Sequence, residues 1–286
     1  MALGRVIGLW RYPVKSMAAE TLSVADVGEE GIVGDRAFGV VDATTGKLMS
    51  AKRFPALLNL RPVRRDDGEV VIYEPSGDIT MSDSTDVHLW LSERLGRSVT
   101  LVRAEPEQRR TIEMDLDDGG VFEFSTQPGS FFDGRSTVHV LSTASLAEAK
   151  RHYPDGDWSV ERFRPAVLVQ FDDAPASEGP DDAPASEGPE DAPAGEGPED
   201  PRAGEWPEDA FVGAEFDLGG PAGVRLSGQK RMDRCIMVTR AQGVHAADKA
   251  ILTTLARVHD ACLGVGCVVT GVGRISVGDS VDLVTL

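Results

Sequence analysis

The chain has 286 residues, of which 41% are hydrophobic and 27% charged, and its formal net charge is −18 at pH 7. This composition excludes disordered and fibrous proteins, and no run approaches the roughly 18 apolar residues that a membrane-spanning helix needs. We therefore expect a globular protein of about two domains with no membrane partner. The N-terminal residues lack the apolar stretch of a signal peptide, and the three cysteines fit a reducing compartment, so the predicted location is cytoplasmic.

Most of the negative charge lies in one segment, between Asp172 and Asp209, which holds fourteen carboxylates and one arginine. The segment repeats a nine-residue unit, first written DDAPASEGP, that has almost no apolar side chain. Such units cannot bury a core, so we predict a disordered acidic insertion over 172–205. It is either a tether for a partner or a neutral insertion grown by repeat slippage. The rest of the chain is only mildly acidic and shows no basic face, which argues against a nucleic-acid partner.

Apolar runs punctuated by Gly, Pro and Asp predict short strands along the whole chain. The clearest are VIGLWRY at the start, FGVVD near residue 40, VHVLS near 140, AVLVQF near 168 and GVRLSG near 225. Helices are predicted over 86–95, 142–152 and 247–258, and a polar linker or solvated loop between Arg103 and Val138. The predicted fold class is mainly β, or α+β with a β core, built from barrels or sandwiches with few helices.

Two polar motifs follow or precede strands near the N-terminus. Lys15 and Ser16 end the sequence YPVKS directly after the first strand, where a charge and a hydroxyl suit an anion. In GIVGDR the glycines permit positive φ and close approach to a ligand, while Arg36 offers a planar fork of donors. An ordinary polar turn explains the first motif equally well, and a hairpin turn explains the second.

The sequence ERFRP places Arg162 and Arg164 at the entrance to a strongly apolar strand. A desolvated arginine needs a carboxylate or an anionic ligand, so ligand binding and structural ion pairing both remain open.

Cys235 follows an arginine in DRCIMVT and is predicted to open another apolar strand. A neighbouring guanidinium favours the thiolate, which is the form that attacks or binds metal, whereas the alternative is a packed core residue. Cys262 and Cys267 lie among small apolar residues and are expected to be buried and inert. The five histidines are scattered without ligand spacing, so a zinc site is disfavoured.

The order of these motifs resembles a known family. LWRYPVKS, GDR, SAKRFP, RFRP, the isolated RC at 234–235 and the closing GRISVGDSVDLV together look like a MOSC protein, named after the C-terminal domain of molybdenum cofactor sulfurases. The resemblance implies an N-terminal MOSC β-barrel domain at 1–105 and a MOSC β-barrel domain at 106–171 and 206–286. It also implies a molybdenum cofactor (molybdopterin) bound between them.

The resemblance further implies roles for single residues, by similarity to the amidoxime-reducing enzymes. Cys235 matches the thiolate ligand of molybdenum and would be the catalytic and metal-binding residue. The residues that match cofactor contacts are Lys15, Ser16, Arg36, Ser136 and Arg164. The chain departs from the family pattern at Ala166, where the motif commonly has an asparagine whose amide would bind the cofactor.

The function that follows from the resemblance is a molybdenum-dependent oxidoreductase that reduces N-hydroxylated small molecules. No cysteine-rich ferredoxin domain and no pyridoxal-phosphate domain accompanies these motifs, so a separate ferredoxin or flavoprotein would supply the electrons. The alternative is a carrier of sulfur or of the molybdenum cofactor that does no turnover. A third possibility is a cofactor-free interaction protein that keeps the fold alone.

Overall fold

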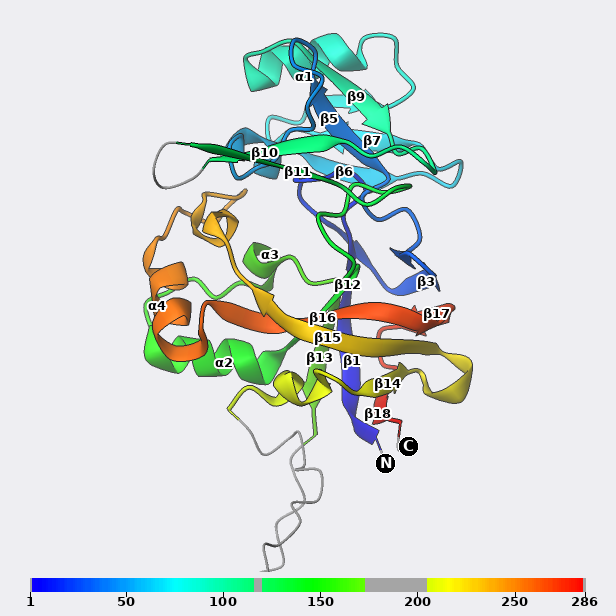
Figure 1. Cartoon of the computed structure of the whole chain (residues 1–286), viewed down its shortest axis with the longest axis vertical. Coiled ribbons are helices and arrows are strands. Elements are labelled where there is room, and N and C mark those ends of the chain that lie inside the picture. Colours follow the sequence, from blue (N-terminus) through cyan, green and yellow to red (C-terminus); the bar gives the residue numbers. More distant parts are fainter. Residues whose placement is uncertain (1, 116–119, 173–204, 285–286) are drawn as a thin grey trace, which may run out of the picture.

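The computed structural model describes residues 2–115, 120–172 and 205–284 (Figure 1). The strands are β1 (Ala2–Arg11), β2 (Glu20–Leu22), β3 (Val24–Gly28), β4 (Gly31–Ile32), β5 (Phe38–Asp42), β6 (Arg61–Arg64), β7 (Val70–Tyr73), β8 (Ile79–Met81), β9 (Val99–Arg103), β10 (Thr111–Asp115), β11 (Val121–Ser125), β12 (Val138–Ser142), β13 (Val167–Phe171), β14 (Glu215–Leu218), β15 (Val224–Asp233), β16 (Cys262–Gly271), β17 (Gly273–Ser276) and β18 (Ser280–Leu283). The α-helices of these ranges are α1 (Val87–Leu95), α2 (Thr143–His152), α3 (Val160–Phe163) and α4 (Ala250–His259). Short 3-10 helices are η1 (Pro55–Asn59), η3 (Pro207–Phe211), η4 (Gly220–Ala222) and η5 (Ile236–Thr239).

Seven strands close into a barrel in the order β13-β12-β16-β15-β14-β18-β1, and the pairing of β1 with β13 completes the ring. The parallel pair β12–β13 needs a crossover connection, which runs through α2 and α3. The barrel interior is filled by side chains with no exposed surface, among them Val6, Val169, Phe216 and Val265. The prediction of a mainly β fold with few helices is therefore confirmed.

Strands β3 and β4 form a small sheet with β17 beside the barrel, and the chain between β4 and β12 forms smaller sheets that lie above the barrel in Figure 1. Strand β5 pairs with β9, β6–β7–β8 form a meander, and β10 pairs with β11. The core shared by β5–β9, the β6–β7–β8 meander and α1 includes Val40, Leu57, Ile72 and Leu91, which are almost fully buried. Strand β1 instead belongs to the barrel, where it pairs with β18, so the two chain ends lie side by side (Figure 1). The proposed domain limits stay predictions, and the acidic repeat falls on 173–204, outside the described residues.

Two local predictions are wrong. The stretch between Arg103 and Val138 contains the hairpin β10–β11, because Ile112 is fully buried beside Val41, Leu48 and Phe131 and so binds the hairpin to the core. The DRCIMVT segment does not open a strand. Strand β15 ends at Asp233, and the apolar residues after Cys235 form the 3-10 turn η5 instead.

The three predicted helices are present with nearly the expected limits. Helix α2 begins after Ser142, whose hydroxyl accepts a hydrogen bond from the Ser145 N–H and so caps the helix. None of the helices in the described ranges is long and apolar enough to cross a bilayer.

Candidate functional site

Two adjoining cavities of about 380 and 200 Å³ lie where the N-terminal sheets meet the barrel. They share several lining residues, and Cys235 and Arg164 are among them. The larger cavity is lined by all the predicted site residues: Lys15, Ser16, Arg36, Ser136, Arg164 and Cys235. Residues more than 200 positions apart in the sequence therefore meet at one place.

Cys235 is the most accessible of the three cysteines. It lies between the end of β15 and the start of η5, is half-buried and lines both cavities. Cys262 and Cys267 are buried, and burial raises the pKa of both thiols. Only Cys235 thus combines solvent access with a cavity, as an attacking or metal-binding thiol requires.

Arg164 is a cation with no ion-pair partner in the described part of the chain. It ends α3, and its side chain makes no hydrogen bond or ion pair with any described residue, although its guanidinium lies 4.2 Å from the centroid of the Tyr12 ring. Burial lowers the pKa of Arg164 to about 10 because the charged form loses hydration. The guanidinium nevertheless stays protonated at pH 7, so it contributes positive charge to both cavities.

Arg234, next to Cys235, likewise has no acidic partner among the described residues. Its side chain donates only to backbone carbonyls, at 3.0 Å to Met232 and 2.8 Å to Phe163, and forms no ion pair with the described residues. Burial lowers the pKa of Arg234 to about 10 as well. Two half-buried cations that form no ion pair with a carboxylate of the described residues therefore flank the thiol, and both favour an anionic ligand.

Arg36 and Lys15 have acidic partners. Arg36 pairs with the adjacent Asp35, and Lys15 pairs with Asp133 and also donates to the carbonyl of Phe131 at 2.8 Å. Burial lowers the pKa of Lys15, and the Asp133 carboxylate opposes this shift. These two cations are held in place by their partners and still face the larger cavity.

Strained backbone is concentrated at this site. Five non-glycine residues of the described ranges have positive φ, and Ser16, Arg36 and Arg164 are among them, at 67°, 48° and 53°. Such conformations cost free energy and cluster at ligand sites, where the surrounding structure enforces them. The Ser16 hydroxyl accepts a hydrogen bond of 3.0 Å from the Ala51 N–H, which ties YPVKS to the SAKRFP segment.

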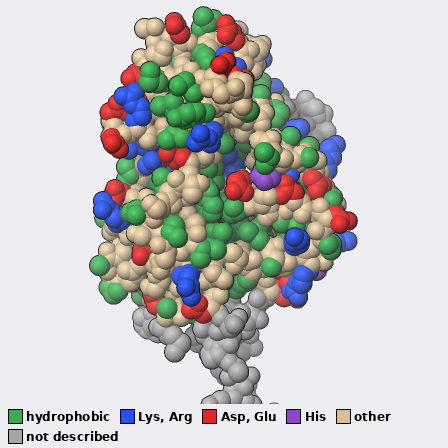
Figure 2. All heavy atoms as spheres, turned by 180° about the vertical axis from the view of Figure 1, so that it is seen from behind, with side chains coloured by type: hydrophobic (Ala, Val, Ile, Leu, Met, Phe, Trp, Pro, Cys, Tyr) green, Lys and Arg blue, Asp and Glu red, His purple; other side chains and the backbone are tan. Residues whose placement is uncertain are grey.

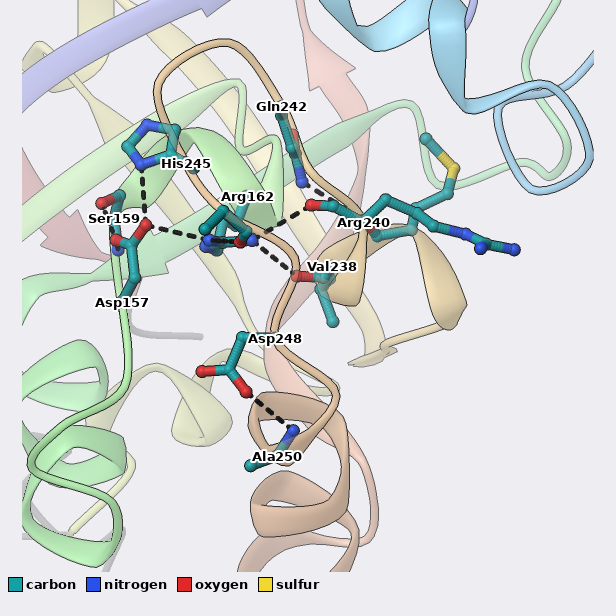
Figure 3. Close-up of polar contacts among 11 residues, drawn as sticks. Asp157, Ser159, Arg162, Val238, Arg240, Gln242, His245, Asp248 and Ala250 are labelled. Atoms are coloured by element: carbon teal, nitrogen blue, oxygen red, sulfur yellow. Dashed lines mark hydrogen bonds and ion pairs between the residues drawn. The ribbon is translucent and has the colours of Figure 1, made fainter.

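Arg162 has the structural role that the sequence left open for the two arginines of ERFRP. Its side chain is fully buried and donates to the carbonyls of Val238, Arg240 and Ala246 and to the carboxylate of Asp157 (Figure 3). These bonds anchor the loop that follows Cys235. Arg164, two residues later, is the one that faces the cavities.

Asp157 is the second anchor of this loop. Its carboxylate accepts hydrogen bonds from Arg162 at 2.9 Å and from Nδ1 of His245 at 2.8 Å, and Ser159 also donates to it (Figure 3). Burial alone would raise the pKa of Asp157, but these donors hold it well below its usual range. The carboxylate therefore stays charged and fixes the loop on both sides of residue 242.

The lining residues that were not predicted as site residues include Lys52, Lys230, Arg234 and His139. Lys52 stands in the SAKRFP motif and so carried a signal that was not used, whereas Arg234 was considered only as the guanidinium beside Cys235. His139 is buried in a strand and had no signal. Burial and the nearby Arg234 lower its pKa well below the ordinary value, so its ring is neutral at pH 7. Ala166 lines the smaller cavity, where it offers only a methyl group.

Comparisons with known proteins bear on the N-terminal part of the chain. No curated protein matches the sequence. A crystal structure of the YUAD protein from Bacillus subtilis is similar over 98% of this chain and 94% of that one, with 13% identity and a TM-score of 0.45. Residues 3–103 match the model of the MOSC N-terminal beta barrel domain. The chain therefore contains a MOSC N-terminal beta barrel domain.

Proposed function

We propose that the protein binds a molybdenum cofactor in the cavities around Cys235 and reduces N-hydroxylated small molecules with electrons from a separate donor protein. The observation that carries this proposal is the pairing of a half-buried thiol with two half-buried arginines, Arg164 and Arg234, that have no acidic partner among the described residues. The MOSC N-terminal domain at 3–103 supports the choice of cofactor.

The residues of the site fit such a group. A pterin cofactor carries an anionic phosphate, which suits the uncompensated arginines and the two paired cations Lys15 and Arg36. A thiolate is a soft ligand, which suits a metal whose other ligands are dithiolene sulfurs. No group of three or more His, Cys, Asp or Glu residues in the described ranges forms a separate metal site, so the cofactor would bring its own metal.

The chain itself would bind the cofactor and orient it. When bound, the cofactor would supply a metal centre that takes an oxygen atom and exchanges two electrons. Reduction of an N–OH group to N–H uses two electrons and two protons and releases water, so the donor protein must deliver two electrons per turnover. Cys235 would hold the metal, Arg164 and Arg234 would neutralise negative charge beside it, and Ser16 and Ser136 would donate hydrogen bonds.

A carrier of sulfur or of the cofactor is the second candidate, and Ala166 favours it. The methyl group of Ala166 lies on the cavity wall and can donate no hydrogen bond where an asparagine amide would. A site with one contact fewer holds its ligand less tightly, as release to another protein requires.

The test is elemental analysis of molybdenum on protein made in a host that synthesises the cofactor, followed by turnover of a hydroxylamine-type substrate with a reduced viologen. Molybdenum near one atom per chain with turnover supports the reductase. Molybdenum without turnover supports a carrier of the cofactor, and absence of molybdenum from the folded protein contradicts both the reductase and the cofactor carrier. Cys235→Ala should lose the metal, while Cys267→Ala is the matched control.

A further inference from the structure

A third cavity, of about 550 Å³, opens elsewhere on the molecule. Arg164 is the single residue that it shares with the two cavities around Cys235. Its walls come from the end of β1, from η1, from the turn after β7, from α3 and from the loop around residue 243. The face seen from behind shows hydrophobic side chains gathered in the middle of the molecule, with a histidine and acidic side chains beside them (Figure 2).

The walls are mainly apolar. Trp10, Leu58 and Tyr73 line the cavity together with Val244, whose relative exposure of 95% is the highest of the large hydrophobic side chains in the described ranges. A concave apolar wall with a few polar groups is the usual form of a small-molecule site. A single exposed valine is ordinary on a protein surface, but this one stands beside such a wall.

Val244 is held in this exposed position by hydrogen bonds. The backbone groups of Gln242 and His245 exchange two of them, at 3.0 and 2.9 Å, so the intervening residues form a closed turn. The N–H of Gly243 donates to Asn59 Oδ1 at 3.1 Å, and Arg162 fixes the chain on both sides of the turn. The apolar rim is therefore preformed, which lowers the entropic cost of binding a ligand there.

The charges at this cavity select an anion. Glu74 is bound to Arg94 at 2.7 Å and His245 is bound to Asp157, so neither is free to recognise a ligand. Arg61 forms no ion pair with the described residues, and its guanidinium carbon lies over the Tyr73 ring, 4.5 Å from the ring centroid. Stacking occupies the face of a guanidinium and leaves its N–H edge open for the two oxygens of a carboxylate.

The acidic side chain Glu161 also lines the cavity without a partner among the described residues, but Arg61 and Arg164 outnumber it. We propose that this cavity binds an amphipathic carboxylate, an aromatic or branched aliphatic acid. Its carboxylate pairs with Arg61, and its apolar body packs against Trp10 and Val244. This site goes beyond the proposed function and shares only Arg164 with the cavities around Cys235, so it is tested on the cofactor-free protein.

The probe is 2-naphthoate, titrated calorimetrically into the full-length protein, with 2-naphthylmethanol and 2-naphthylmethylamine as neutral and cationic analogues. We expect one-to-one binding in which the carboxylate binds about tenfold more tightly than the alcohol, as a charge-assisted pair provides. Arg61→Gln should remove this preference and leave the affinity for the alcohol unchanged. Arg5→Gln, an exposed arginine on β1, is the matched control and should bind like the wild type.

Val244→Asp tests the apolar rim and should weaken 2-naphthoate by about tenfold, through the lost apolar contact and the added negative charge. Val272→Asp is its control, since both valines are exposed and neither substitution buries a charge. Tighter binding of the amine, equal binding to Arg61→Gln and wild type, or displacement of 2-naphthoate by inorganic phosphate would each overturn the proposal. The last result would place the probe in the cavity of Cys235, and none of these measurements requires molybdenum.

Discussion

Arg36 and Arg164 place their guanidinium groups against the same aromatic ring, 4.4 and 4.2 Å from the centroid of Tyr12. Tyr12 is itself fixed, because its hydroxyl donates to the Pro165 carbonyl at 3.0 Å and its N–H to Asp35 at 2.6 Å. The ring therefore holds two like charges that one carboxylate, Asp35, balances only in part. An anion bound beside them relieves this repulsion.

Replacement of Arg164 by methionine should cost little stability. The residue has no ion pair to lose among the described residues, so removal of its ring contact should lower the free energy of unfolding by less than about 2 kcal/mol. Arg162→Met is the matched control, because it removes the ion pair with Asp157 and leaves three buried carbonyls without their arginine donor, and it should cost about 3–5 kcal/mol. Denaturant melts of the cofactor-free proteins measure both, and an equal loss in the two variants would show that Arg164 is structural.

Inorganic phosphate should stabilise the cofactor-free wild type. A ligand that binds only the native state adds about 2.7 kcal/mol when its concentration is a hundred times its dissociation constant. The rise in thermal midpoint should be much smaller in Arg164→Met, whereas Arg5→Gln should respond like the wild type. A wild type that ignores phosphate would argue against an anion site at Arg164.

Cys235 should react with a maleimide well before the other thiols. It is half-buried on a cavity, whereas Cys262 and Cys267 are buried and have raised pKa values. Mass spectrometry of peptides after brief labelling should therefore find the reagent on Cys235 alone. Labelling of Cys267 at a similar rate would show that the barrel core opens, and Cys235→Ala should abolish the fast reaction.

The contribution of Asp157 to the stability of the fold should depend on pH. Its pKa in the folded protein lies below the usual value, so its hydrogen bonds stabilise the fold fully above about pH 4 and are lost as pH falls further. The difference in thermal midpoint between wild type and Asp157→Asn should thus be largest near neutral pH and shrink toward pH 3. A difference that stays constant over this range would mean that the carboxylate charge does not hold the loop.

Substitution by alanine should destabilise the protein far more at Gly264 than at Gly77, although both glycines have positive φ. A methyl group at Gly264 would lie 2.3 Å from Nε2 of His139 and 2.7 Å from the Val140 carbonyl oxygen, while at Gly77 nothing lies within 4 Å. Gly77→Ala should cost about 1 kcal/mol of backbone strain, and Gly264→Ala about 1–3 kcal/mol more. Equal losses in denaturant melts would show that His139 moves aside freely.

The sequence by itself determined most of the strands and the three longer helices, because apolar periodicity and turn residues act over a few neighbouring positions. It failed at β10–β11, where charged residues between the apolar ones hid the strand, and at Cys235, where an apolar run forms a 3-10 turn. The choice of Lys15, Ser16, Arg36, Ser136, Arg164 and Cys235 came from the order of motifs along the chain, and the fold gathers all of them at one cavity.

Only the tertiary structure decided what each charge does. Arg162 and Arg164 are two residues apart and look equivalent in the sequence, yet one is bonded to Asp157 and three carbonyls while the other has no acidic partner among the described residues. The partners of a side chain come from segments that are distant in the sequence, so the neighbouring residues do not indicate which partners it has. The same holds for the cavity at Arg61, which exists because separate turns and strand ends enclose a space that no single segment defines.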